Sequence, residues 1–247
     1  MSKSDYLKGS VYHMTHLKNL LSILHEEALY SKRIVWTKAI AMTSIASEHV
    51  QDLRDRIFIR SDAPERYLSL HDYVPFYFAT RTAMLRREHE SGLQEAILLF
   101  EFDRRNLLRE PGVLFTDGNA SNQQLTRNGG ESVIIEPATA LTDQCIRKYL
   151  PSGPHGKNDN CSNFYSDSYF LDRLNWYAIN NRRSGIGDSR RQKQAEILIP
   201  NSVSLRWIRR IVVSTERTAA SVCSMVDASK AGRKYDIKVE IVKDLFF

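Results

Sequence analysis

The stretch Arg190-Arg191-Gln192-Lys193-Gln194-Ala195-Glu196-Ile197-Leu198-Ile199-Pro200 runs from a basic, polar loop directly into a short apolar strand. Residues 197–199 are typical of a buried strand, and Pro200 ends it. Glu196 stands where the loop meets the strand, so we expect its carboxylate to be fixed by the sheet and open to the loop side. A glutamate that ends a strand is also an ordinary surface residue, and other stretches must decide between the two interpretations.

The composition favours a globular protein of one domain, residues 1–247. The chain is 42% hydrophobic and 26% charged, and it has neither a repeat nor a low-complexity linker. It has no apolar run that could span a bilayer, and residues 1–5 lack the apolar core of a signal peptide, so we expect a cytoplasmic protein without a membrane partner. Cys145, Cys161 and Cys223 are too scattered for a zinc site or a disulfide scaffold, and we expect no metal.

Charge and aromatic residues indicate a nucleic-acid partner. The net charge is +6, and residues 182–193 hold five cations and one anion just before Glu196. Aromatic rings beside cations suit a surface that stacks bases and binds phosphates, although part of this aromatic set also fits the core face of a helix. The candidate nucleic-acid residues are Asn119, Tyr165, Tyr169, Trp176, Arg182, Arg183, Arg190 and Arg191.

Strands and helices alternate without strict regularity. Strands are predicted at 9–15, 94–102, 113–116, 208–213 and 235–242, and helices at 17–29, 44–56, from Thr82 onward, and at 216–229. The aromatic run 70–78 predicts a central or pocket-lining strand in which Pro75 indicates an edge or a bulge. No glycine-rich phosphate loop follows a strand, which excludes a dinucleotide-binding doubly wound sheet and a Walker site. Residues 122–163 receive no chemical role.

Four short strings, in this order, resemble the DarT family of ADP-ribosyltransferase toxins. They are Tyr12-His13-Met14-Thr15, Leu70-His71-Asp72-Tyr73-Val74-Pro75-Phe76-Tyr77-Phe78, Phe115-Thr116-Asp117-Gly118-Asn119-Ala120 and Gln194-Ala195-Glu196. The resemblance implies an α+β fold, a split mixed β-sheet core with surrounding helices as in ADP-ribosyltransferases. It also implies NAD as the donor and a nucleobase in single-stranded DNA as the acceptor.

The resemblance assigns roles to individual residues. Glu196 takes the position of the catalytic glutamate, and the segment from Ile45 to Arg54 resembles the family segment that leads to an active-site arginine. The positions implied to contact NAD are His13, Thr15, Asn19, Tyr77 and Met84. The resemblance further implies a cognate antitoxin that removes ADP-ribose or blocks the enzyme.

This chemistry needs few groups. Cleavage of the bond between nicotinamide and ribose develops positive character on the sugar, which a carboxylate stabilises, and the same carboxylate can accept the proton that the attacking base loses. Arg54 suits a pyrophosphate oxygen or a base edge. Two alternatives stay open at this point: the same chemistry on RNA bases, and an inactive nucleic-acid-binding module.

Overall fold

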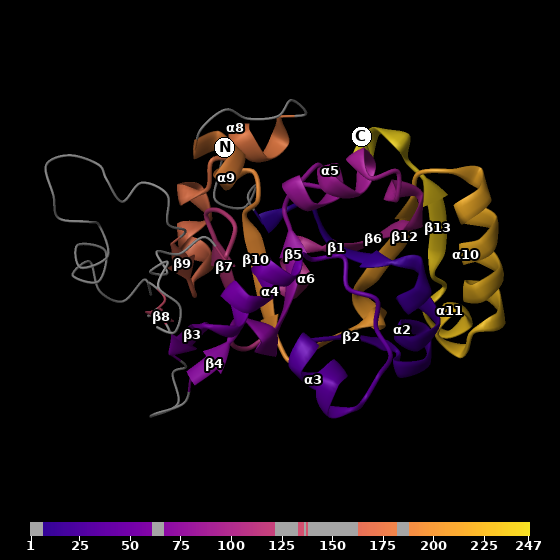
Figure 1. Cartoon of the computed structure of the whole chain (residues 1–247), viewed down its shortest axis with the longest axis horizontal. Helices are drawn as coiled ribbons and strands as arrows, with labels where there is room; N and C mark the ends of the chain where they lie inside the picture. Colours follow the sequence, from indigo (N-terminus) through magenta and orange to yellow (C-terminus); the bar gives the residue numbers. More distant parts are fainter. Residues whose placement is uncertain (1–6, 61–66, 122–132, 136, 138–162, 182–187) are drawn as a thin grey trace, which may run out of the picture.

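The computed structural model describes residues 7–60, 67–121, 133–135, 137, 163–181 and 188–247. Its centre is a mixed sheet of eight strands, shown in Figure 1. In spatial order the strands are β13 (Lys238–Ile241), β12 (Ile208–Val213), β6 (Ile97–Asp103), β1 (Ser10–His16), β5 (Tyr73–Tyr77), β10 (Glu196–Pro200), β7 (Leu114–Thr116) and β9 (Phe164–Tyr165). Strands β12 and β13 run parallel, whereas β1, β5, β6, β7, β9 and β10 pair antiparallel with one another. The expected α+β class with a mixed sheet is confirmed.

The sheet is split between β1 and β5. Strand β1 pairs with β6 along its whole length, from Ser10 opposite Asp103 to His16 opposite Ile97, but it meets β5 at Tyr12 opposite Tyr77. Pro75 lies in this separated part of β5 and pairs with β10 opposite Leu198. The expectation of an edge strand at Pro75 is therefore wrong. Pro75 is tolerated in this central strand because β5 separates from β1 here. The N–H that proline lacks is therefore not needed for pairing with β1.

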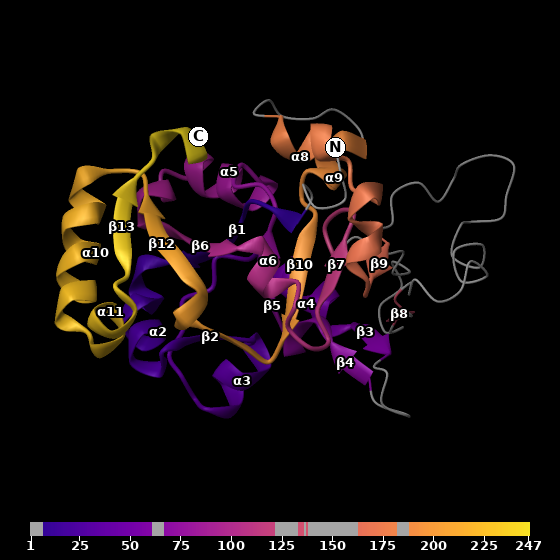
Figure 2. The ribbon, with the colours of Figure 1, turned by 180° about the vertical axis from the view of Figure 1, so that it is seen from behind.

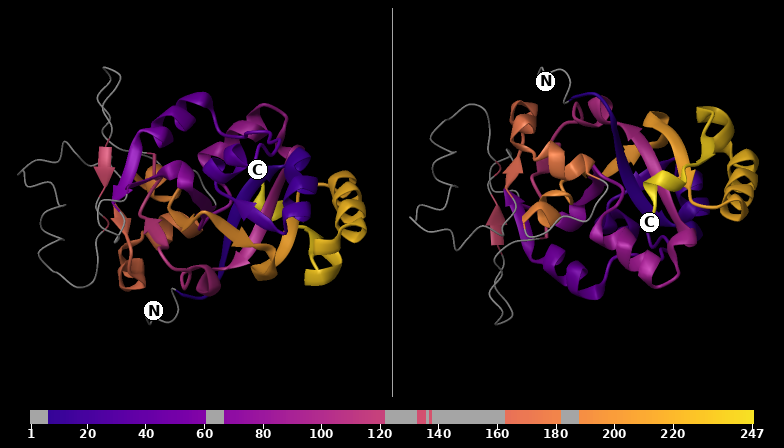
Figure 3. Two further views of the ribbon diagram at one scale, coloured as in Figure 1. Left: turned by 90° about the horizontal axis from the view of Figure 1, so that it is seen from below. Right: turned by 90° about the horizontal axis from the view of Figure 1, so that it is seen from above.

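Helices surround the sheet on both sides and at both edges (Figures 1 and 2). At the β13 edge lie α2 (Leu20–Glu26), α10 (Glu216–Ala228) and α11 (Lys230–Tyr235). The upper end of the molecule in Figure 1 carries α5 (Ala83–Glu90), α8 (Trp176–Asn180) and α9 (Asp188–Gln192). Near β5 in Figure 1 lie α4 (Glu48–Asp55) and α6 (Arg104–Leu107), whereas α3 (Lys32–Thr37) lies beside β2. Figure 3 shows the same fold from below and from above.

Two small sheets and short 3-10 helices complete the described fold. One sheet orders β4 (Tyr67–Ser69), β3 (Ile57–Arg60) and β8 (Val133–Ile135), and the other pairs β11 (Ser202–Ser204) with β2 (Ala28–Tyr30). The 3-10 helices are η1 (Leu17–Asn19), η2 (Leu70–Asp72), η3 (Gln94–Ala96), η4 (Ser168–Arg173), η5 (Leu205–Trp207) and η6 (Lys243–Leu245). Among the described residues, no helix has the length and apolar character to cross a bilayer.

The core explains why the central strands read as apolar in sequence. In β6 the first six residues are all buried, as expected for a strand covered on both faces. Phe76 of β5 meets Phe102 of β6 edge to face, with ring centroids 5.2 Å apart. This ring contact packs β5 against β6.

Local capping corrects two helix boundaries. The helix expected at 17–29 ends at Glu26, because Glu27 adopts a left-handed conformation with φ 54°, and β2 follows at once. The helix expected at 44–56 begins at Glu48, where the Ser47 side chain accepts a hydrogen bond from the Val50 N–H. Residues 44–47 thereby stay free to line a cavity.

Candidate active site

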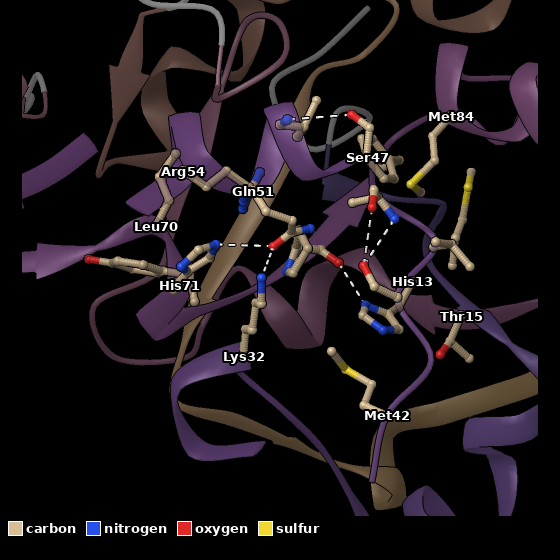
Figure 4. A pocket seen from close by; sticks show the side chains of 18 of the residues that line it. His13, Thr15, Lys32, Met42, Ser47, Gln51, Arg54, Leu70, His71 and Met84 are labelled. Carbon is tan, nitrogen blue, oxygen red and sulfur yellow. Dashed lines mark hydrogen bonds between the residues drawn. The ribbon is translucent and has the colours of Figure 1, made fainter. Parts of the chain in front are cut away.

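A cavity of about 310 Å³ lies at the split of the sheet. Figure 4 shows that His13, Thr15, Met42 and Met84 face it from one side, with Lys32, Gln51, Arg54 and His71 across from them. The first group comes from β1, the 38–47 loop and α5, and the second comes from α3, α4 and η2. Residues separated by most of the chain therefore share one chamber.

Glu196 lies behind this cavity and is paired with Arg54. The Arg54 guanidinium Nη1 is 3.2 Å from Glu196 Oε2, and the side chains are 9% and 0% exposed. The second carboxylate oxygen, Oε1, accepts the Ala120 N–H at 3.0 Å. The Glu196 N–H donates to the Thr116 hydroxyl at 3.2 Å. The carboxylate is thus held by charge and by hydrogen bonds from two other segments.

The expectation that Glu196 is open to the loop is wrong in this structure. Glu196 does begin β10, as predicted, but β10 lies between β5 and β7 in the sheet interior. The turn after β7 brings Ala120 against one side of the carboxylate, and α4 brings Arg54 against the other. Arg54 lines the cavity, and its Nη2 is buried without a hydrogen-bond partner among the described residues. Arg54 therefore keeps one buried donor that no described residue uses.

His13 is fixed as a neutral ring. Its Nδ1 donates to the Pro75 carbonyl oxygen at 2.9 Å, across the split between β1 and β5 (Figure 4). Burial lowers the pKa of His13, and the hydrogen bond to Pro75 opposes that shift only partly. With Nδ1 protonated and the ring neutral, Nε2 is left as a hydrogen-bond acceptor. An acceptor of this kind fits a sugar hydroxyl.

Asn19 connects the first strand to the cavity loop. Its amide nitrogen donates to the Thr15 hydroxyl at 3.0 Å and to the Thr43 carbonyl at 2.9 Å, while its amide oxygen accepts the Thr43 N–H at 2.7 Å. The side chain is buried, so these bonds are protected from water. Thr15 and Asn19 both line the cavity, and Asn19 also holds the loop that forms one wall. Their contact with NAD stays a prediction.

Tyr77 and Met84 place an aromatic ring and a thioether near the carboxylate. Tyr77 is directly opposite Glu196 in the β5–β10 register, and both Tyr77 and Met84 line the cavity. Burial raises the pKa of Tyr77, and the Glu196 charge adds to the increase. Thr82 caps α5 by accepting the Leu85 N–H, which fixes Met84 in the first turn. Both side chains give the cavity wall apolar surface.

A polar cluster opposite His13 was not predicted from sequence. The Gln51 amide oxygen accepts hydrogen bonds from Lys32 Nζ and from His71 Nε2, the latter at 3.1 Å. Lys32 also lies over the Trp36 ring, 4.5 Å from its centroid. Gln51 precedes Arg54 by three residues, about one helical turn. The helix predicted at 44–56 therefore indicates that both side chains lie on one face. Lys32 offered no such signal, because α3 is joined to the cavity by tertiary contacts.

The predicted nucleic-acid residues fall into different environments. Asn119 lines the cavity and Arg190 is exposed on α9. Arg191, by contrast, pairs with Asp117 at 3.0 Å and its side chain is only 12% exposed. Arg182 and Arg183 lie outside the described residues, as does the Tyr169 side chain.

Two of the predicted aromatic contacts, Tyr165 and Trp176, are partly buried and pack against the core. Tyr165 stacks on Phe115 with centroids 5.3 Å apart. The Trp176 ring lies under the Arg104 guanidinium at 4.7 Å, and its indole N–H donates to the Leu171 carbonyl at 2.7 Å. These contacts favour a role in core packing for both rings over a role in stacking nucleic-acid bases.

Among the described residues, no group of three or more His, Cys, Asp and Glu side chains could hold a metal ion. The cavity wall carries the Arg54 guanidinium, the neutral His13 ring and apolar side chains, and the Glu196 carboxylate lies behind Arg54. This set can bind a ligand with sugar hydroxyls, a flat ring and negative charge, and it can stabilise positive character beside the carboxylate.

Comparison with protein families identifies one match along nearly the whole chain. The model of DarT, described as ssDNA thymidine ADP-ribosyltransferase, matches residues 12–138 and 147–247. Two curated relatives are described as DNA ADP-ribosyl transferases. The protein from Thermus aquaticus is 26% identical over 218 residues, 87% of this chain and 80% of that protein. The one from Thermus sp. (strain 2.9) is 26% identical over 242 residues, 96% of this chain and 95% of that protein.

Solved structures share the fold. Thermus sp. 2.9 DarT in complex with ADP-ribosylated ssDNA superposes with a TM-score of 0.69 at 24% identity, covering 96% of both chains. The same protein in complex with NAD+ gives a TM-score of 0.65 at 22% identity, covering 96% of this chain and 97% of that one. Thermosipho africanus DarTG in complex with ADP-ribose gives 0.65 at 20% identity, covering 96% of this chain but 51% of that longer one.

Proposed function

This chain belongs to the DarT family of ssDNA thymidine ADP-ribosyltransferases, and we propose that it transfers ADP-ribose from NAD to a nucleobase in single-stranded DNA, releasing nicotinamide. The acceptor named in the family description is thymidine. One observation carries the proposal: a single cavity is lined by His13, Tyr77 and Arg54, with Glu196 paired behind Arg54. The relative solved in complex with NAD+ shares this fold, which supports NAD as the donor.

The donor side of the cavity is formed by His13, Thr15, Asn19, Tyr77 and Met84. His13 Nε2 accepts a ribose hydroxyl, since Nδ1 is already committed to Pro75. Tyr77 and Met84 enclose the flat nicotinamide ring next to Glu196. The loop held by Asn19 through Thr43 covers the donor from the side. These groups orient the ribose so that its reacting carbon faces the carboxylate.

Glu196 is the catalytic carboxylate. The bond from ribose C1′ to the nicotinamide nitrogen breaks with its electron pair going to nicotinamide, and a ring nitrogen of the base forms the new bond to C1′. Glu196 stabilises the positive character at C1′ and accepts the proton that the base nitrogen loses. To reach substrate, Glu196 requires Arg54 to turn its guanidinium aside. The unpartnered Nη2 of Arg54 then binds a pyrophosphate oxygen or the base edge.

Incubation with labelled NAD and oligonucleotides tests this function. We expect label on a single-stranded DNA that contains thymidine, and none on a DNA of equal length without thymidine or on an RNA of the matching sequence. Label on RNA alone would overturn the DNA assignment. Release of nicotinamide without label on any strand would show an NAD hydrolase.

We further propose that the activity is toxic in the cytoplasm and is held in check by an antitoxin that removes ADP-ribose or blocks the enzyme. The fold shared with half of a longer Thermosipho africanus DarTG chain, solved with ADP-ribose, supports this arrangement. Induced expression should arrest growth, and Glu196→Gln should relieve the arrest. Equal arrest by both chains would argue against a toxic transferase.

A further inference from the structure

A second cavity, of about 370 Å³, lies between α5 and α9, and we call it the α5–α9 cleft. Five cations line it, Arg81, Arg86, Arg87, Arg190 and Lys193, together with one carboxylate, Glu90. Both helices lie at the same end of the molecule in the front and rear views (Figures 1 and 2). So many like charges in one cleft repel one another unless an anion occupies it.

The ion pairs within the cleft leave a positive excess. Arg86 pairs with Glu90 at 2.7 Å, and Arg87 pairs with Glu88 at 2.7 Å. Arg190 is exposed and has no carboxylate partner in the described part of the chain, and Arg81 Nε is buried there without a hydrogen-bond partner. Lys193 is buried, and both its burial and the Arg81 charge lower its pKa. Its ammonium donates a hydrogen bond to the Asn181 carbonyl oxygen. The surplus charge is therefore concentrated at Arg81 and Arg190.

The α5–α9 cleft adjoins the catalytic cavity. Ala83, Arg87 and Gln194 line both, and Gln194 precedes Glu196 by two residues. The cleft also contains the Phe247 ring, which lies 5.6 Å from the Arg81 guanidinium. The Gln94 amide holds the Phe247 backbone through two hydrogen bonds, of 2.9 and 3.1 Å. Cations beside a fixed aromatic ring match the needs of a single nucleic-acid strand better than those of a free phosphate.

We propose that the α5–α9 cleft binds the phosphodiester backbone of the acceptor strand adjacent to the nucleotide that enters the catalytic cavity. The inference rests on the proposed function, because it assumes that the acceptor is a nucleic acid. The positions assigned to NAD on β1 and η1, His13, Thr15 and Asn19, line the catalytic cavity and not this cleft. The phosphates bound here accordingly belong to the acceptor and not to the donor.

The test compares two double variants that remove the same charge. Arg81→Gln with Arg190→Gln changes the cleft, whereas Arg105→Gln with Arg217→Gln changes exposed residues on α6 and α10. Binding of a fluorescent thymidine-containing single strand is measured by anisotropy between low and moderate salt, without NAD. NAD affinity is measured separately by calorimetry without DNA.

We expect the cleft variant to bind the strand roughly ten-fold more weakly at about 0.1 M salt, with a log-log salt slope smaller by about 1.4, or 0.7 for each lost contact. The control variant should keep the parent slope, and NAD affinity should be unchanged in both. Equal slopes in the two variants would overturn the proposal, as would a loss of NAD affinity in the cleft variant, which would assign the cleft to the donor pyrophosphate. Binding is measured without transfer, so the two proposals can fail separately. If the parent protein binds DNA and the cleft variant lowers the salt slope as expected, but the parent never modifies DNA, the proposed reaction is contradicted and the cleft assignment stands.

Discussion

Two arginine–carboxylate pairs in this protein contrast the centre of the sheet with its surface. In the centre, Arg54 and Glu196 are 3.2 Å apart with side chains 9% and 0% exposed. On α5, Arg86 and Glu90 are closer, at 2.7 Å, but 50% and 59% exposed. The shorter pair is the weaker one, because water screens it and competes for its hydrogen bonds. Burial, and not the distance between the charged atoms, therefore decides which ion pair contributes more to the free energy of unfolding.

The largest effect should follow from breaking the buried pair. Glu196→Ala leaves the Arg54 guanidinium buried without its carboxylate, so the free energy of unfolding should fall by ~3–5 kcal/mol. Chemical denaturation of both single variants and of Glu196→Ala with Arg54→Ala measures it. The double variant should lose much less than the sum of the single losses. Additive losses would mean that the two charges do not depend on each other.

The next largest effect concerns catalysis, and it needs a variant that keeps the shape of the site. Glu196→Gln retains an oxygen for the Ala120 N–H and removes the negative charge, so transfer should fall by about 100-fold or more. The measurement is the initial rate of DNA labelling at saturating NAD. Circular dichroism and an unchanged NAD affinity serve as the control. A rate near that of the parent would remove Glu196 from the catalytic role.

Donor binding should depend on the separated strands β1 and β5. His13→Ala and Tyr77→Ala each remove a cavity contact, and we expect NAD affinity to weaken roughly ten-fold, about 1.4 kcal/mol. Calorimetric titration measures this, with single-strand affinity as the matched readout. Loss of DNA affinity with NAD affinity retained would place these side chains on the acceptor side instead.

Acid should weaken the buried centre through His71. Burial, together with the charges of Lys32 and Arg54, lowers the pKa of His71 to about 4, while Asp55 opposes the shift. The unfolded chain therefore binds more protons than the folded chain between pH 6.5 and about 4, so this stability is present above pH 6.5 and is lost as the pH falls. The Tm of the parent should decrease over this range more than that of His71→Gln. The exposed His49→Gln is the control, and a pH profile identical in all three would exclude His71 as the source.

The smallest effect should come from the exposed pair. Arg86→Gln removes a solvent-screened contact within one helix, and the free energy of unfolding should change by no more than about 0.5 kcal/mol. Denaturation under the same conditions as for the Arg54 variants makes the comparison direct. A loss as large as that at Arg54 would show that exposure is a poor guide to the contribution of an ion pair in this protein.

Much of the fold was predictable from local patterns. Short-range periodicity predicted the apolar strand β6, the strand β12 and the helix α10. Together with Pro200, it also predicted that Glu196 stands at the start of β10. The cavity positions of His13, Tyr77 and Met84 followed from a family resemblance, and their roles in NAD binding stay predictions. The edge position predicted from Pro75 was wrong because the sequence of a strand does not specify which strands lie beside it.

By itself the sequence determined that β1, β6, β10 and β12 form strands with apolar residues that must be buried. It also determined that a carboxylate stands where a basic segment enters the sheet. Only the tertiary structure decided that this carboxylate is covered by an arginine 142 positions away and that Pro75 belongs to a central strand. It also decided that Arg81 and Lys193 line one cleft, the α5–α9 cleft. The physical reason is that propensity and periodicity act over a few residues, whereas the partner of a buried charge is chosen by chain packing, which brings together groups that share no local pattern.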